Sequence, residues 1–253
     1  MDPLMYLIAG AFAVLGAVLA SFVGVVSERA YTGTSWAIGR SKCDSCGTFL
    51  EGLDLVPVLS WLLSLGRCRH CAARVTAVHA LSEAVLGALF ALSYLTLGLT
   101  LPLLAFLAAL LVLTFIVLYD LRHTIVPPLA SGLLILLSVF FAALTSESVE
   151  RFGLTLLIAG VIGLGFFLLF AGSGGRAMGL GDSPVALALS LLVGGVLAVS
   201  GLLFSFWIGA LVGVLILVRH PKGHRMGIEV PFVPFLAAGY LLAFFTQWNF
   251  LSF

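Results

Sequence analysis

Residues 184–218 read PVALALSLLVGGVLAVSGLLFSFWIGALVGVLILV and contain no charged side chain. A single helix over this stretch would be about 52 Å long, whereas the hydrocarbon core of a bilayer is only ~30 Å thick. Two short membrane helices that turn near Ser200-Gly201 therefore fit the stretch better than one long helix. This choice decides how many times the chain crosses the membrane, and so on which side each loop lies.

The whole chain has the composition of a membrane protein. Of its 253 residues, 62% are hydrophobic and 9% are charged, whereas soluble domains are about 25% charged. The net charge of +1 gives no indication of nucleic-acid binding. We predict an all-α polytopic membrane protein with about eight transmembrane helices, each an apolar run of about 20 residues. These runs lie at roughly 4–26, 78–98, 101–120, 127–145, 152–171, 184–200, 202–218 and 231–249.

The distribution of Lys and Arg predicts the orientation. Eight crossings leave Arg151 alone on one side of the membrane and put every other Lys and Arg on the opposite side. With seven crossings, the basic residues Arg219, Lys222 and Arg225 would lie on the same side as Arg151, so the distribution of charge favours eight. Because basic loops stay in the cytoplasm, we expect the N-terminus outside and the loop at 27–77 inside. The cytoplasmic set is Arg29, Arg40, Lys42, Arg67, Arg69, Arg74, Arg122, Arg176, Arg219, Lys222 and Arg225.

All four cysteines lie in this first loop, as Cys43-x2-Cys46 and Cys68-x2-Cys71. Two such pairs supply four thiolates for one tetrahedral metal ion, and we predict a structural zinc. Disulfides are the alternative, which a reducing cytoplasm disfavours, and a redox role is a second alternative. With four cysteine ligands the site is closed, so we expect the zinc to shape the loop and to take no part in catalysis.

Two glycines suit the turns of the cysteine pairs, Gly47 after the first pair and Gly66 before the second. Between the pairs, Leu53 to Leu65 is apolar but too short to cross a bilayer. We expect this segment either to lie on the membrane or to pack under the cysteine pairs.

Two aspartates, Asp120 and Asp182, stand at the ends of apolar runs, both at cytoplasmic ends. Carboxylates at membrane depth are costly and usually functional. Two carboxylic acids that share one proton can activate a water molecule to attack a peptide bond. The pair therefore predicts an intramembrane aspartyl protease. Gly179 and Gly181, in the sequence GLGD, would admit the substrate backbone and allow positive φ. The alternative is that each aspartate caps a helix or reaches water.

A third acid, Glu83, lies in the second span. We expect it to form a structural pair with an arginine such as Arg29 or Arg74, with contact to substrate as the alternative.

These residues together resemble the bacterial type IV prepilin leader peptidase/N-methyltransferase family of GxGD intramembrane aspartyl proteases. Glu83 matches a glutamate at that place in the family. The other matching segments are SFVGVV at 21–26 with Arg29, SKCDSCG at 41–47, VPVLSW at 56–61, GRCRHC at 66–71, YDL at 119–121, MGLGD at 178–182 and PFVPFL at 231–236.

The resemblance implies the activity, the partners and one cofactor. The substrates would be type IV prepilins or the pseudopilins of type II secretion, in the bacterial inner membrane. Their short basic leader, ending in glycine, would be cut off by Asp120 and Asp182. The new N-terminus would then be methylated from S-adenosylmethionine. The chain would divide into a first transmembrane helix at 1–26, a cytoplasmic tetracysteine zinc loop at 27–77 and a seven-helix protease core at 78–253.

Four positions depart from the family pattern. Gly24 replaces an asparagine, Pro128 an aspartate, Pro184 a lysine and Val233 a glycine. These changes bear on substrate preference and methylation. They leave two alternatives open: a related intramembrane protease with other substrates and no methylation, and a proton- or cation-coupled transporter that uses the two acids. The sequence does not indicate which pilin or secretion system is served, nor the oligomeric state.

Overall fold

The computed structural model describes residues 3–35, 39–176, 178–219 and 230–250. Contacts group the chain into two units, Met1–Leu99 and Thr100–Phe253, each of which is considered by itself. Regular structure in the described residues is helical, apart from two isolated β-bridges in the cysteine loop. The expected all-α fold class is confirmed.

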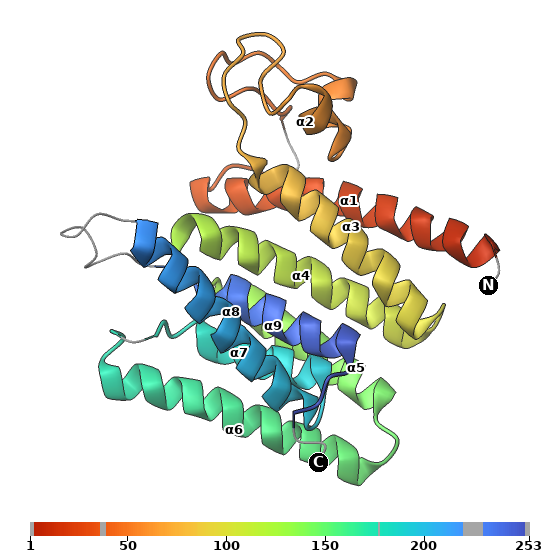
Figure 1. The fold of residues 1–253 in the computed structure, drawn as a ribbon, viewed down its shortest axis with the longest axis vertical. Coiled ribbons are helices and arrows are strands. Elements are labelled where there is room, and N and C mark those ends of the chain that lie inside the picture. The colour runs from red at the N-terminus through yellow and green to blue at the C-terminus, as the bar shows by residue number, and fades with distance from the viewer. Residues whose placement is uncertain (1–2, 36–38, 177, 220–229, 251–253) are drawn as a thin grey trace. The chain divides into compact units, whose positions relative to one another are not determined.

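The first unit pairs two membrane helices, α1 (Pro3–Thr32) and α3 (Ala77–Leu97) (Figure 1). They cross closely at Gly16 and Gly87. A Cβ added at Gly16 would lie 2.7 Å from the Leu86 carbonyl oxygen, and one at Gly87 would lie 2.7 Å from that of Ala13. Small residues let membrane helices approach in this way. The loop between the helices carries a 3₁₀ helix, η1 (Gly52–Leu55), and the short α2 (Leu59–Leu63).

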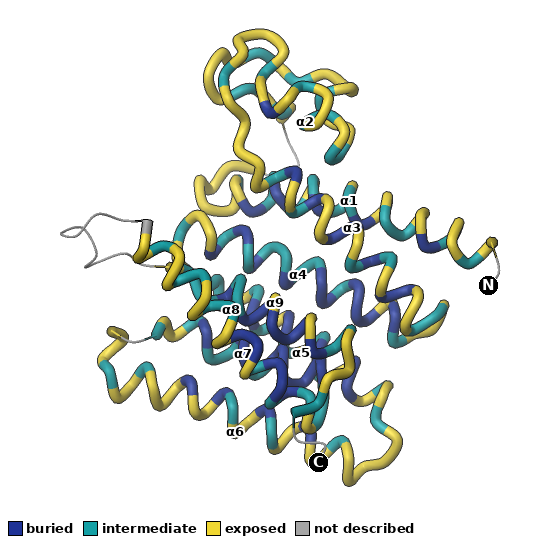
Figure 2. The backbone as a smooth tube through the Cα atoms, in the orientation of Figure 1, coloured by how far each residue is buried: buried dark blue, intermediate teal, exposed yellow. Residues whose placement is uncertain are grey.

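In the described residues of the second unit, five helices pack around or beside a short central helix, α7 (Asp182–Val193). The burial map shows α7 as an almost continuously buried segment (Figure 2), and it contacts α5, α6, α8 and α9. Nine of the twelve residues of α7 are buried, so nearly every face of this helix contacts other parts of the unit. The other helices are α4 (Leu101–His123), α5 (Pro128–Thr145), α6 (Val149–Ser173), α8 (Leu197–Arg219) and α9 (Val233–Thr246).

Each expected apolar run therefore corresponds to one helix. Within the described residues, six helices are long and apolar enough to cross a membrane, and α7 and α9 are apolar but shorter. The basic residues Lys222 and Arg225 of the orientation argument lie outside the described residues.

The predicted turn near Ser200-Gly201 is wrong by about one helical turn and a half. The chain breaks instead at Gly194 and Gly195, whose φ angles are +80° and +47°, values that glycine adopts without steric penalty. Ser200 and Gly201 lie inside α8. A Cβ at Gly201 would come within 2.8 Å of the Tyr240 ring, so this glycine permits the contact between α8 and α9 and does not form a turn.

Candidate active site and metal centre

Asp120 lies in the last turn of α4 and is 5% exposed. The helix ends just beyond it, where Thr124 adopts a left-handed conformation and donates its backbone N–H to the Asp120 carbonyl oxygen at 2.8 Å. Oδ2 of Asp120 has no hydrogen-bond partner among the described residues. A buried carboxyl oxygen without a partner is unfavourable, and such groups are found at catalytic and ligand-binding positions.

Asp182 is the first residue of α7 and is 7% exposed. Its Oδ2 accepts the backbone N–H of Gly179 at 3.1 Å, and its own N–H donates to the Gly179 carbonyl at 3.3 Å. The carboxylate thus bonds to the preceding turn, and α7 has no side-chain cap. Neither aspartate caps a helix N-terminus, and neither extends into water.

The two aspartates belong to one site in the second unit, where their carboxyl groups interact electrostatically. Gly181 brings the two segments together: a Cβ added there would lie 2.5 Å from the Cβ of Val126, in the connection that follows α4. Neither glycine uses the positive φ that its residue type allows, since Gly181 has a φ of −67° and Gly179 is not among the positive-φ glycines. Gly181 is required for close approach.

A third segment reaches the same site. The backbone N–H of Val233, at the start of α9, lies close enough to the Asp120 carboxyl to interact with it. The Val233 side chain is fully buried. One of the four departures from the family pattern therefore stands beside an aspartate. Sequence reasoning had placed it only at the entrance of the last helix.

Two buried carboxyl groups in electrostatic contact define the chemistry available here. Two carboxyl groups in one buried site ionise together only at high energetic cost. A pair that shares one proton offers a base and an acid side by side. That combination is suited to activating a water and protonating a leaving group.

Glu83 lies in the first unit, on α3, and is 8% exposed. Its Oε2 accepts the backbone N–H of Val58 at 2.7 Å. Val58 is the residue before α2 and has a φ of +61°, a costly conformation for a β-branched side chain. The expected arginine partner is wrong: no ion pair to Glu83 forms in the described part of the chain. Glu83 instead fixes the cysteine loop to α3.

The other departures lie at helix contacts or starts. A Cβ at Gly24 would lie 3.2 Å from Nδ1 of His79, so the family's asparagine would collide with α3 unless His79 moved. Pro128 is the first residue of α5 and Pro184 lies in the first turn of α7, where proline is well tolerated.

The four cysteines gather into one cluster. The sulfurs of Cys43, Cys46, Cys68 and Cys71 lie within 4.8 Å of one another, with 3.9 Å between those of Cys43 and Cys71. A tetrahedral metal with sulfurs at ~2.3 Å requires sulfur–sulfur distances of about 3.8 Å. All four are free thiols, as the metal-site hypothesis requires. The cluster is close enough to bind a metal ion.

The two cysteine pairs have the same backbone design. The carbonyl of Cys43 accepts the N–H of Gly47, and that of Cys68 accepts the N–H of Ala72, at 2.8 and 2.9 Å. Both residues have positive φ, +71° and +55°. Gly47 and Gly66 adopt positive φ as expected, but the equivalent role of Ala72 was missed. Its position four residues after Cys68, matching Gly47 after Cys43, was the signal.

Hydrogen bonds tune the thiols. The backbone N–H groups of Cys71 and His70 lower the pKa of Cys68 to about 6. The side chain and backbone of Thr48 lower the pKa of Cys46. The pKa of Cys71 is raised to about 11: the backbone of Ala73 opposes the rise, but desolvation and the neighbouring thiols outweigh it. The thiolate is the form that binds metal. The lowered pKa values of Cys46 and Cys68 favour this form, whereas Cys71 must lose its proton when a metal binds.

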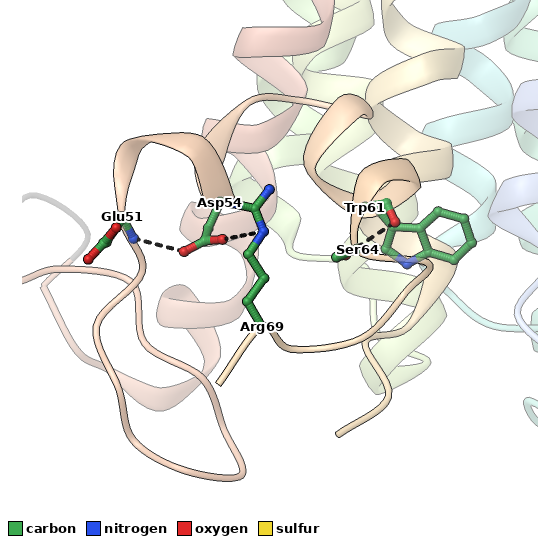
Figure 3. A network of polar contacts seen from close by, with 5 residues as sticks. All are labelled: Glu51, Asp54, Trp61, Ser64 and Arg69. Carbon is green, nitrogen blue, oxygen red and sulfur yellow. Dashed lines mark hydrogen bonds and ion pairs between the residues drawn. The ribbon is translucent and has the colours of Figure 1, made fainter. Parts of the chain in front are cut away.

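Polar contacts connect η1 to the second cysteine pair (Figure 3). Asp54 accepts the backbone N–H of Glu51 at 3.1 Å and pairs with Nε of Arg69 at 3.3 Å. Arg69 stands between Cys68 and Cys71, so this pair orients the second half of the cluster. Trp61 and Ser64 form a separate contact in α2, where the Ser64 hydroxyl donates to the Trp61 carbonyl.

Comparison with known proteins adds the following findings. The model of the bacterial peptidase A24 N-terminal domain matches residues 14–97. A protein of Bacillus subtilis (strain 168) is 26% identical over 240 residues, covering 95% of each chain. One from Aeromonas hydrophila is 32% identical, covering 85% of this chain and 76% of its own. One from Myxococcus xanthus is 31% identical, covering 81% and 62%. All three are named prepilin leader peptidase/N-methyltransferase. No solved structure matches the chain significantly.

Proposed function

The chain belongs to the prepilin leader peptidase/N-methyltransferase family, and we propose from that premise that it is an aspartic endopeptidase of prepilins. It removes the short basic leader of type IV prepilins or pseudopilins at the cytoplasmic face of the bacterial inner membrane. The transporter alternative is not favoured, because the relatives are named as peptidases. The observation that carries the proposal is the buried, electrostatically coupled pair of Asp120 and Asp182.

The catalytic step uses both carboxyl groups. The ionised aspartate takes a proton from water, and the resulting hydroxide adds to the carbonyl carbon of the scissile peptide bond. The protonated aspartate donates its proton to the leaving nitrogen as the carbon–nitrogen bond breaks. The products are a leader ending in a carboxyl group and a mature pilin with a free amino terminus. Gly179 and Gly181 support the site by keeping side chains out of it.

The N-terminus lies outside in this proposal, and the cysteine loop lies in the cytoplasm. Four cysteine sulfurs within 4.8 Å of one another favour zinc over metals that prefer oxygen ligands. The zinc would be structural, because the four cysteines fill its coordination shell and leave no position for a reacting water. Glu83 supports the loop from α3.

Methylation is the second proposed activity. The amine exposed by cleavage would attack the methyl group of S-adenosylmethionine. The bond between the methyl carbon and the sulfur breaks, and the rest of the donor leaves as a thioether. We assign no residue of this chain to that donor. The departures at Gly24, Pro128, Pro184 and Val233 leave both aspartates in place, and the backbone N–H of Val233 interacts with the Asp120 carboxyl.

The test is co-expression with a prepilin that carries a Gly–Phe leader junction, followed by mass spectrometry of the pilin. The variants are Asp120→Asn and Asp182→Asn, with the exposed Asp44→Asn as the matched control. We expect leader loss in the wild type and in the control only. A further mass of one methyl group at the new N-terminus would show the second activity.

Cleavage that survives Asp120→Asn or Asp182→Asn would refute the catalytic pair. Wild-type protein that is folded and metal-loaded, yet leaves several prepilins uncut, would favour the alternative of a related protease with other substrates. The same experiment with Val233→Gly then shows whether the family residue restores prepilin cleavage.

A further inference from the structure

The segment from η1 through α2 exposes several large apolar side chains. Leu63 is 76% exposed and Leu65 84% exposed, and Leu53, Leu55, Leu59 and Leu62 are exposed as well. A segment packed under the cysteine pairs would bury these side chains. One of the two arrangements expected from the sequence is therefore ruled out, and the apolar surface needs a different partner.

The start of α2 is fixed beside the side of a membrane helix. The bond from the Val58 N–H to Glu83 attaches it to α3 at 2.7 Å. Glu83 is six residues into α3, which corresponds to about 9 Å along the helix axis. Because α3 requires almost its full length to cross a bilayer, this attachment point lies at or below the head-group level.

The end of α2 is held at the first residues of the same helix. The indole Nε1–H of Trp61 donates to the Val75 carbonyl at 3.2 Å, and the Val75 N–H donates to the Gly66 carbonyl at 2.8 Å. Val75 is two residues before Ala77, where α3 begins. Both ends of α2 are thus attached where α3 enters the membrane.

Positive charge accompanies these apolar side chains. Arg67 and Arg74 face each other across an isolated β-bridge directly after Leu65. Both are exposed, and neither forms an ion pair with another described residue. Apolar side chains beside unpaired arginines are the combination that binds an anionic membrane surface.

We propose that residues 52–65 form an interfacial membrane anchor. The leucines insert at the boundary between head groups and acyl chains, and Arg67 and Arg74 contact anionic head groups. The anchor holds the cysteine cluster at the membrane surface, next to α3. This role goes beyond peptidase activity and does not depend on it.

The test places a photoactivatable benzophenone amino acid at single positions of the full-length chain. The chain is reconstituted in vesicles of phosphatidylethanolamine and phosphatidylglycerol. The test positions are Leu63 and Leu65. Leu81, 63% exposed on α3, is the control for lipid contact near the depth of Glu83. His70, exposed between two cysteines, is the control for a site away from lipid. Mass spectrometry identifies what each residue is joined to.

We expect lipid adducts at positions 63, 65 and 81, and none at 70. Lipid adducts at 81 without any at 63 or 65 would overturn the anchor. So would adducts at 63 or 65 that join a protein, such as a co-expressed prepilin, in place of lipid.

A second measurement leaves α2 unsubstituted, in case the labelled variants fail to fold. Trp36, Trp207 and Trp248 are replaced by phenylalanine, so that only Trp61 fluoresces. We expect lipids brominated near the head-group end of their chains to quench Trp61 strongly. Fluorescence that brominated lipid leaves unchanged, and that aqueous iodide quenches, would place α2 in water and refute the proposal.

Discussion

Gly181 lies so close to Val126 that a Cβ added to the glycine would be 2.5 Å from the Cβ of the valine. Val126 follows α4, whose last turn carries Asp120, and Gly181 directly precedes Asp182. The absence of one side chain therefore allows the two aspartate-bearing segments to meet. The glycine next to the aspartate in the GLGD sequence has a packing role that is specific to this position.

Gly181→Ala should lower the rate of leader cleavage about 100-fold while leaving the protein inserted and folded. The added methyl group pushes the start of α7 away from Val126, and displacement of a reacting group by about 1 Å is enough to lower a rate about 100-fold. The measurement is prepilin cleavage by the purified variant. Gly165→Ala, on α6, where an added Cβ meets nothing within 4 Å, should retain wild-type cleavage. Full activity of Gly181→Ala would show that the contact is not required.

Glu83→Leu should loosen the cysteine loop, whereas Glu83→Gln should not. Leucine leaves the half-buried Val58 N–H without an acceptor, a loss of about 1–3 kcal/mol. Glutamine retains an acceptor oxygen and removes only the charge. Limited proteolysis of residues 33–76 in the membrane-embedded protein measures the difference. Equal protection of the two variants would argue against the bond as the attachment.

The helices could be predicted from the sequence because a bilayer imposes a simple rule on apolar length. The break between α7 and α8 could not be placed, because Gly194-Gly195 and Ser200-Gly201 both look like turns. The φ angles of the first pair and the contact of Gly201 with Tyr240 distinguish them. Only the packing of α9 shows which glycine is needed for approach and which for a turn.

Within the candidate site, residue types indicated the chemistry and left the contacts undetermined. The carboxyls of Asp120 and Asp182 and the four thiols were recognisable from spacing. The partner of Glu83 could not be recognised in this way. Glu83 accepts a hydrogen bond from a backbone N–H, and every residue except proline carries such a group. The approach of Val233 to Asp120 likewise depends on how α9 folds back onto α4.

Cys68→Ser should release the bound metal and expose the loop to protease. The wild-type protein should contain one equivalent of zinc, because four sulfurs within 4.8 Å form one site. Removing a ligand also removes the folding energy that a structural metal supplies. Elemental analysis of purified protein gives the zinc content, with Ser45→Ala, between the first two ligands, as the control. Wild-type protein that contains no zinc when isolated with metal present would contradict the assignment.

Replacements at the two equivalent turn residues should have opposite effects on the cysteine cluster. Gly47→Ala forces a side chain into positive φ, a penalty of roughly 1–2 kcal/mol. Ala72→Gly removes that penalty. This gain is larger than the ~0.5–1 kcal/mol of stability that glycine loses through its greater freedom in the unfolded chain. The rate at which a chelator removes zinc from the full-length protein measures both effects. We expect faster release from Gly47→Ala and slower release from Ala72→Gly. An added methyl group at Gly47 meets open space, so its effect there comes from the backbone conformation alone. A change in the same direction for both variants would mean that backbone conformation does not govern metal retention.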